Sequence, residues 1–258
     1  MARTTKARLI DAKIRTIRFG RRFFGHRILL LERWSGRQSF GLNGLDDKVR
    51  DIMQAKNGYY VELGANDGRS QSNTLQLELF DGWRGVLIEP VPKVFLKLTF
   101  NRSRRRNHFA NVGCVSEAFP SKTLRIAEAN LMSVPLDVDS DLLNPLEHAR
   151  RGREIQAGYS ESKQEDIIEV PAVTLTQVLE DANAPDVIDF LSLDVEGGEL
   201  EVLKGIDFDR YSFRWILIES RSPDRLKKFM SAQGYFFDQA LTSNDLLFSN
   251  VRASSPGQ

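Results

Sequence analysis

The chain has 258 residues, of which 41% are hydrophobic and 28% are charged, with 36 Lys and Arg residues against 35 Asp and Glu residues. This length supports one large domain with its own hydrophobic core, and the single Cys114 excludes a disulfide framework and a cysteine-rich zinc site. No stretch without Asp, Glu, Lys or Arg exceeds 10 residues, and the start lacks the apolar core of a secretory signal, so we expect a soluble, cytoplasmic protein.

The near-neutral net charge of the whole chain conceals a basic first segment. Residues 1–37 hold eleven Lys and Arg residues and two acidic residues, which leaves a net charge of −8 on the other 221 residues. Apolar residues such as Ile10, Ile14 and Ile17 recur at helical spacing, which predicts a basic amphipathic helix. That helix could pack on the domain, contact a partner protein, or lie peripherally on the inner face of a membrane. We expect no nucleic-acid partner, because the remaining body is acidic.

Residues 1–58 are expected to form a basic helical extension, and residues 59–258 the main domain. From residue 59, strand patterns alternate with helix patterns. The predicted strands are 59–63, 85–89, 107–112, 187–193 and 213–219, and the predicted helices are 73–80, 93–100, 198–203 and 224–233. Two further strands, 235–238 and 245–250, form a predicted terminal hairpin. This alternation is typical of a doubly wound α/β domain with a mostly parallel sheet.

An irregular insertion at about 118–173 interrupts the alternation. It contains four prolines and a strongly charged run, with short predicted strands at 122–128 and 167–170 around a loop and a helical piece. Long insertions in α/β enzymes often cover the substrate. The insertion is therefore either a substrate lid or a mobile excursion without a role.

Two motifs follow neighbouring predicted strands, where open α/β sheets bind their ligands. The first is the glycine-containing turn Glu62–Gly68, which lets a ligand approach the backbone closely and leads into a helix. The second is Glu89, 25 residues beyond Gly64, where a carboxylate can accept hydrogen bonds from both hydroxyls of a ribose. Together they predict a site for a nucleoside cofactor.

The chemistry of the turn narrows the choice of cofactor. It lacks the G-x-G-x-x-G spacing of nicotinamide sites, and the chain has no P-loop. The acidic Glu62 on the strand disfavours a phosphate and suits a cationic group. S-adenosylmethionine carries an amino group and a sulfonium and no phosphate, so it fits this pattern.

Over roughly 59–250 the sequence resembles the FkbM-type S-adenosylmethionine-dependent methyltransferases. The resemblance lies in Tyr60–Gly68, Gly85–Pro92, Asn111–Glu117, Phe190–Gly205 and Trp215–Ser220. The fourth segment is the most specific, because a strand that runs into D-V-E-G and then E-x-x-V-L-x-G is the signature of that family. The resemblance implies a Rossmann-like class I methyltransferase fold, with a seven-stranded sheet and an antiparallel last strand.

The resemblance also implies roles for individual residues and a reaction. It implies O-methylation of a sugar, polyketide or similar hydroxyl-bearing product. The methionine end of the cofactor would be lined by Glu62, Gly64, Asn66 and Gly68. Glu89 would bind the ribose, and Asp194 would lie beside the sulfonium and the acceptor.

A hydroxyl acceptor is a poor nucleophile, so we expect a general base or a metal ion to assist. None of the histidines follows a predicted central strand, and we expect all three to be structural or exposed: His26, His108 and His148. The base is then a carboxylate, with Asp194 as the first candidate and Glu196 and Glu219 nearby. Glu196 could instead act only on the helix dipole, and Asp194 and Glu219 could share Mg²⁺ or Ca²⁺.

The run Asp137–Asp141 begins like a calcium loop, with acids at alternate positions. Its sixth position is Leu142 rather than glycine and its twelfth is His148 rather than glutamate, which excludes an EF-hand. The leading prediction is a methyltransferase that acts on a hydroxyl of a sugar, polysaccharide or glycolipid precursor. The alternatives are a non-catalytic binding module with the same pocket and a nicotinamide-dependent oxidoreductase.

Overall fold

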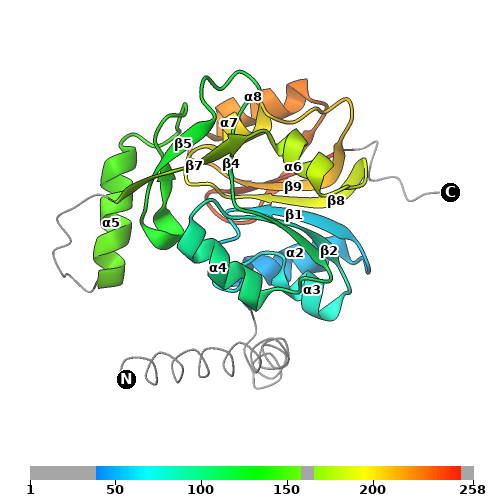
Figure 1. The fold of residues 1–258 in the computed structure, drawn as a ribbon. Helices are drawn as coiled ribbons and strands as arrows, with labels where there is room; N and C mark the ends of the chain where they lie inside the picture. The colour runs from blue at the N-terminus through cyan, green and yellow to red at the C-terminus, as the bar shows by residue number, and fades with distance from the viewer. Residues whose placement is uncertain (1–38, 158–165, 251–258) are drawn as a thin grey trace, which may run out of the picture.

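The computed structural model describes residues 39–157 and 166–250, and the predicted basic helix within residues 1–37 lies outside them. The centre of the fold is a seven-stranded sheet in the order β10-β11-β9-β8-β1-β2-β3 (Figure 1). Its strands are β1 (Tyr59–Leu63), β2 (Arg84–Ile88), β3 (Asn107–Ala110), β8 (Val187–Leu193), β9 (Ser212–Glu219), β10 (Phe236–Ala240) and β11 (Asp245–Ser249). Only β11 runs antiparallel to its neighbours β9 and β10. The predicted fold class and the terminal hairpin are confirmed.

Helices cover both faces of this sheet. One face packs against α2 (Leu45–Met53), α3 (Leu75–Phe80) and α4 (Pro92–Asn101), and the other against α6 (Leu175–Asp181), α7 (Glu199–Leu203) and α8 (Pro223–Ala232) (Figure 1). Because β1 is buried on both faces, Val61 and Leu63 join one core cluster while Tyr60 joins the other. None of the helices in the described ranges is both long and apolar enough to cross a membrane.

The folded domain begins before the boundary expected from the sequence. Helix α2 and the short 3-10 helix η1 (Leu42–Gly44) precede residue 59, and Leu45 and Val49 are buried in one cluster with Trp83. Helix α2 is thus part of the core, which corrects the boundary at residue 58. The sequence concealed this because most residues of α2 are polar and only a narrow apolar stripe enters the core.

The insertion forms a second, smaller sheet in the order β4-β7-β5-β6. Its elements are β4 (Gly113–Cys114), β5 (Thr123–Ala127), the 3-10 helix η2 (Asn130–Met132), β6 (Val134–Pro135), α5 (Pro145–Ala157) and β7 (Ile167–Val173). Helix α5 packs on η2 so closely that a Cβ atom at Gly152 would lie 2.6 Å from the Cβ atom of Met132. Most of the insertion is therefore regular structure, whereas the sequence indicated only two short strands and a helical piece.

Candidate active site

A pocket opens where β1, β2 and β8 end side by side in the main sheet. Its volume is about 940 Å³, which includes the solvent-filled space of the open mouth. The lining includes four of the predicted site residues: Gly64, Asn66, Glu89 and Asp194. Glu196 also lines the pocket, whereas Glu62, Gly68 and Glu219 are not part of the lining.

Gly64 brings the ends of β1 and β8 together. Its backbone has a φ of +73°, and a Cβ atom here would lie 1.8 Å from the carbonyl oxygen of Asp194. Directly before it, the Leu63 carbonyl accepts a hydrogen bond from the amide of Asp194 at 3.4 Å. Only glycine permits both the left-handed conformation and this close approach. The glycine therefore fixes the position of Asp194 at the floor of the pocket.

Glu89 is buried at the carboxyl end of β2. Its carboxylate accepts hydrogen bonds from the backbone amides of Asn66, at 3.0 Å, and Val91, at 2.9 Å. Burial raises the pKa of Glu89 to about 7, although the two amides oppose the shift. The carboxylate thus joins the ends of β1 and β2 and faces the pocket.

Glu62 takes part in a buried polar network beside the pocket. Its carboxylate accepts hydrogen bonds from the Asn73 amide, at 2.9 Å, and the Thr74 hydroxyl, at 2.7 Å. The guanidinium of Arg102 lies 3.3 Å from Glu62 and 2.7 Å from Glu78, and all three side chains are almost inaccessible to solvent. These contacts occupy Glu62, so the structure does not bring it to the cofactor site as the sequence had suggested. Glu62 instead stabilises the segment after the turn through its hydrogen bonds to Asn73 and Thr74.

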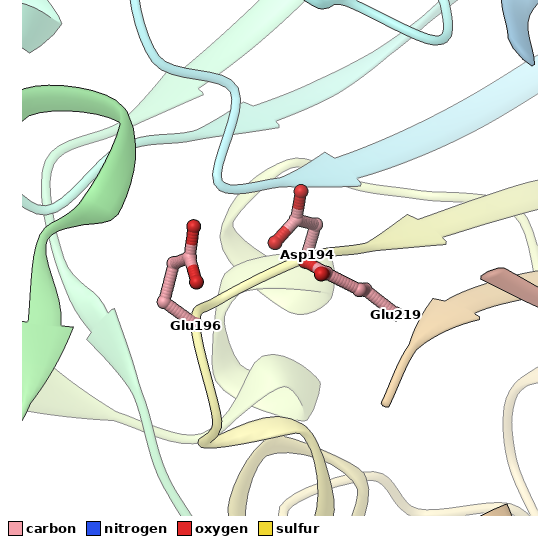
Figure 2. Close-up of side chains that lie close together, drawn as sticks. All are labelled: Asp194, Glu196 and Glu219. Carbon is pink, nitrogen blue, oxygen red and sulfur yellow. The ribbon is translucent and has the colours of Figure 1, made fainter. Parts of the chain in front are cut away.

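Three carboxylates gather beyond the ends of β8 and β9: Asp194, Glu196 and Glu219 (Figure 2). One oxygen from each lies within 4.8 Å of the others. The Asp194 side chain lines the pocket and is exposed to solvent there, while the surrounding protein restricts its hydration. Burial and the neighbouring Glu219 raise the pKa of Asp194 well above its ordinary range, and the same two causes raise the pKa of Glu196 to about 7. The cluster therefore contains groups that can exchange protons near neutral pH.

Two basic side chains hold the outer part of this cluster. The guanidinium of Arg221 lies 3.2 Å from Glu196 and 3.4 Å from Glu219. The Nε2 atom of His148 lies 2.9 Å from the Glu196 carboxylate. Burial and Arg221 lower the pKa of His148, which favours a neutral imidazole at neutral pH. The three carboxylates have the geometry to hold a divalent cation, and Arg221 already supplies one positive charge to two of them.

The insertion supplies part of this site through its acidic run. Asp141 accepts hydrogen bonds from the Ser220 hydroxyl, at 2.9 Å, and the Arg221 amide, at 2.6 Å, while its own amide donates to the Gly197 carbonyl at 3.1 Å. Asp137 and Asp139 form ion pairs with Arg125 and Arg225. The described part of the insertion is thus docked on the loops that follow β8 and β9. The acids that resemble a calcium loop serve as anchors within the chain.

Sequence reasoning missed the contribution of His148 and Asp141. Both lie in the irregular insertion, and His148 is 48 residues from its partner Glu196. No local pattern indicates such a contact, because it depends on how the second sheet packs against the first.

The fold and the pocket define a Rossmann-like class I methyltransferase. The sequence model of the Methyltransferase FkbM domain matches residues 62–237. The chain belongs to this family, and the domain is an S-adenosylmethionine-dependent methyltransferase domain. Among curated proteins, no sequence matches the chain.

Several solved structures are similar to the chain. The methyltransferase domain of METTL16 is 16% identical with a TM-score of 0.43, over 80% of this chain and 66% of that one. The FkbM methyltransferase from Methylobacillus flagellatus KT is 17% identical with a TM-score of 0.42, over 75% and 43%. Precorrin-6y C5,15-methyltransferase from Geobacter metallireducens GS-15 is 12% identical with a TM-score of 0.40, over 83% and 95%. The chain thus spans less than half of the FkbM structure.

The residues at the pocket fit the cofactor of this family. Glu89 offers carboxylate oxygens to the hydroxyls of a ribose, and Asp194 offers negative charge to a sulfonium. Gly64 has no side chain in the turn after β1, and a Cβ atom there would collide with the carbonyl oxygen of Asp194. The chemistry of these groups therefore suits a cationic nucleoside and not a pyrophosphate.

Proposed function

We propose that this domain methylates a hydroxyl group of a sugar, polysaccharide or glycolipid precursor. The observation that carries the proposal is the carboxylate cluster at the inner end of the pocket, beside the predicted cofactor residues. Its three carboxylates are only partly neutralised by Arg221, because the neutral imidazole of His148 contributes a hydrogen-bonding contact and no charge. Such a site disfavours an anionic acceptor and suits a neutral hydroxyl that must lose a proton.

Each part of the pocket has a separate task. Glu89 binds the ribose of the cofactor, and Asp194 favours the positive charge near it. Apolar side chains of the insertion line the opposite wall and exclude water: Leu124, Ile126, Leu131, Pro135 and Val138. The cofactor, when bound, supplies a methyl group activated by the adjacent positive charge.

The chain's carboxylates take up the proton of the acceptor. Asp194 is the primary candidate, since it lines the pocket and the neighbouring Glu219 makes it more basic. The sulfonium of a bound cofactor would favour the ionised form of Asp194. Asp194 could then accept the hydroxyl proton of the acceptor, while the methyl group would leave the sulfur for the acceptor oxygen. Glu196 and Glu219 assist by sharing negative charge with Asp194, and Arg221 keeps both in place.

The cofactor assignment is tested by calorimetric titration of the full chain with S-adenosylmethionine, S-adenosylhomocysteine and, as a control ligand, NADH. We expect micromolar binding of both sulfur ligands, loss of that binding in Glu89→Ala, and no change in Glu169→Ala, which removes an exposed carboxylate on β7. Heat with NADH alone would contradict the assignment. If none of the three ligands gave a heat of binding to a folded sample, the result would favour a non-catalytic binding module.

The acceptor class is tested by following S-adenosylhomocysteine release with neutral glycans, glycolipids, phenols and carboxylic acids. We expect turnover only with the neutral hydroxyl compounds, and a loss of kcat in Asp194→Asn that is larger than the weakening of cofactor binding caused by the lost negative charge. Turnover confined to the carboxylic acids would overturn the hydroxyl proposal. Repeating the assay with EDTA separates proton acceptance by a carboxylate from assistance by a metal ion.

A further inference from the structure

Helix α4 has an apolar strip on its solvent-facing side. Its inner side is buried through Val94 and Leu98, as the core requires. On the opposite side, Leu96 and Phe100 lie one helical turn apart and are 59% and 45% exposed. Two large apolar side chains in adjacent positions form a patch rather than scattered exposure.

Basic residues lie close to this strip along the chain. Between Glu89 and Glu117 the chain has six Lys and Arg residues and no acidic residue. Lys97, Arg104 and Arg105 are exposed, and Arg104 lies at the end of α4, where its Nε atom is 3.5 Å from the Thr99 carbonyl. Lys93, at the start of the helix, is paired with Glu128 and is not counted. We call Leu96, Lys97, Phe100, Arg104 and Arg105 the basic face of α4.

The charge of this face restricts what can cover it. Residues 1–37 of the same chain carry a net charge of +9, and a second copy of the basic face is also positive, so both would be repelled. The phosphates of a nucleic acid would engage the lysine and the two arginines, but they would leave the apolar side chains of Leu96 and Phe100 without a partner. Apolar side chains among cations match the interface of an anionic bilayer. There the apolar side chains enter the boundary of the acyl chains, and the cationic side chains contact the headgroups.

We propose that the basic face of α4 binds an anionic lipid surface. The basic segment 1–37 carries charge of the same sign, so both parts of the chain would be attracted to one membrane. This inference concerns a surface outside the pocket and does not depend on methyl transfer. It would remain true if the acceptor class proposed above were wrong.

The lone cysteine allows a direct local test in the full chain. Cys114 is buried, and burial raises the pKa of its thiol to about 12, so it reacts slowly with labels. A cysteine introduced as Leu96→Cys can then carry an environment-sensitive fluorophore. Ile155→Cys is the matched control, because Ile155 is exposed on helix α5 among charges of both signs. The probes are phosphatidylglycerol-containing vesicles and pure phosphatidylcholine vesicles.

We expect the label at position 96 to brighten by about twofold and shift to shorter wavelength with anionic vesicles only, while the label at 155 stays unchanged. Sedimentation of the double variant Lys97→Glu/Arg104→Glu should show about tenfold weaker vesicle binding than the wild type. Binding of the wild type without a signal at position 96 would mean that the basic segment alone contacts the lipid, which overturns the proposal. A signal at position 96 with RNA and not with vesicles would overturn it in favour of a nucleic-acid surface.

Discussion

At Gly64, the addition of a single methyl group should disrupt the geometry of the pocket. A Cβ atom there would overlap the Asp194 carbonyl at 1.8 Å, so Gly64→Ala must move the end of β8 or the turn. We expect loss of cofactor binding by titration, with a destabilisation of about 2 kcal/mol or more. Gly234→Ala is the matched control, because Gly234 also has a positive φ but nothing lies within 4 Å of its Cβ position. Equal losses in both variants would show that the backbone conformation, not the overlap, is responsible.

Arg102 is the only cation of the buried network that holds the first turn, among the residues described. Arg102→Met leaves the carboxylates of Glu62 and Glu78 buried without their positive partner. We expect the free energy of unfolding in urea to fall by about 3–5 kcal/mol. Arg105→Met, at an exposed position, should change it by less than about 0.5 kcal/mol. If both variants unfold at the same urea concentration, the network contributes little.

At the scale of elements, the insertion is held by Asp141 on the loops that follow β8 and β9. Asp141→Ala removes the acceptor for the Ser220 hydroxyl and the Arg221 amide. We expect a loss of about 1–3 kcal/mol in stability and faster hydrogen exchange in segments 140–148 and 196–198. Asp186→Ala, on an exposed loop outside the insertion, should leave exchange in these segments unchanged. Unaltered exchange in Asp141→Ala would mean that the remaining contacts, His148 with Glu196 among them, are sufficient.

The main sheet was predictable because its strands carry nearly continuous apolar runs, as in Val187–Leu193, and turns separate them from the helices. Four of the six predicted cofactor residues line the pocket for the same reason, since three of them directly follow a strand and Asn66 lies two residues beyond Gly64 in the turn after β1. Helix α6 was missed although Thr174 caps it, with its side chain accepting a hydrogen bond from the Gln177 amide at 3.1 Å. The burial of Glu62 had no signal, because its partner Arg102 is 40 residues away.

At the scale of the whole molecule, buried carboxyl groups make stability depend on pH. Burial raises the pKa of Glu89 to about 7 and that of Glu199 to about 8. The folded protein therefore holds these protons more tightly than the unfolded chain does, so the contribution of these two groups to stability is fully present below the ordinary carboxyl pKa and is lost as the pH rises towards 8. We expect the free protein to lose a few kcal/mol between pH 5 and pH 8, because each tenfold difference in proton affinity between the folded and unfolded states corresponds to about 1.4 kcal/mol.

Thermal unfolding across this pH range measures the effect. Glu199→Gln keeps an oxygen that can accept the hydrogen bonds of the Val195 and Gly197 amides, but it does not titrate. Its melting temperature should vary less with pH than that of the wild type. The same slope in both proteins would assign the pH dependence to other groups.

The attachment of the insertion through Asp141 also limits how such proteins can be recombined. Asp141 precedes Ser220 by 79 residues, and His148 precedes Glu196 by 48. If the insertion of a relative replaced this one, its anchoring acids would therefore lack their partners on the loops after β8 and β9. A productive chimera must exchange three separated segments together, the insertion and both loops, and random crossovers rarely achieve this. The lining of the pocket is then easier to change by point substitutions on the pocket side of β5 and β6, which leave the anchors intact.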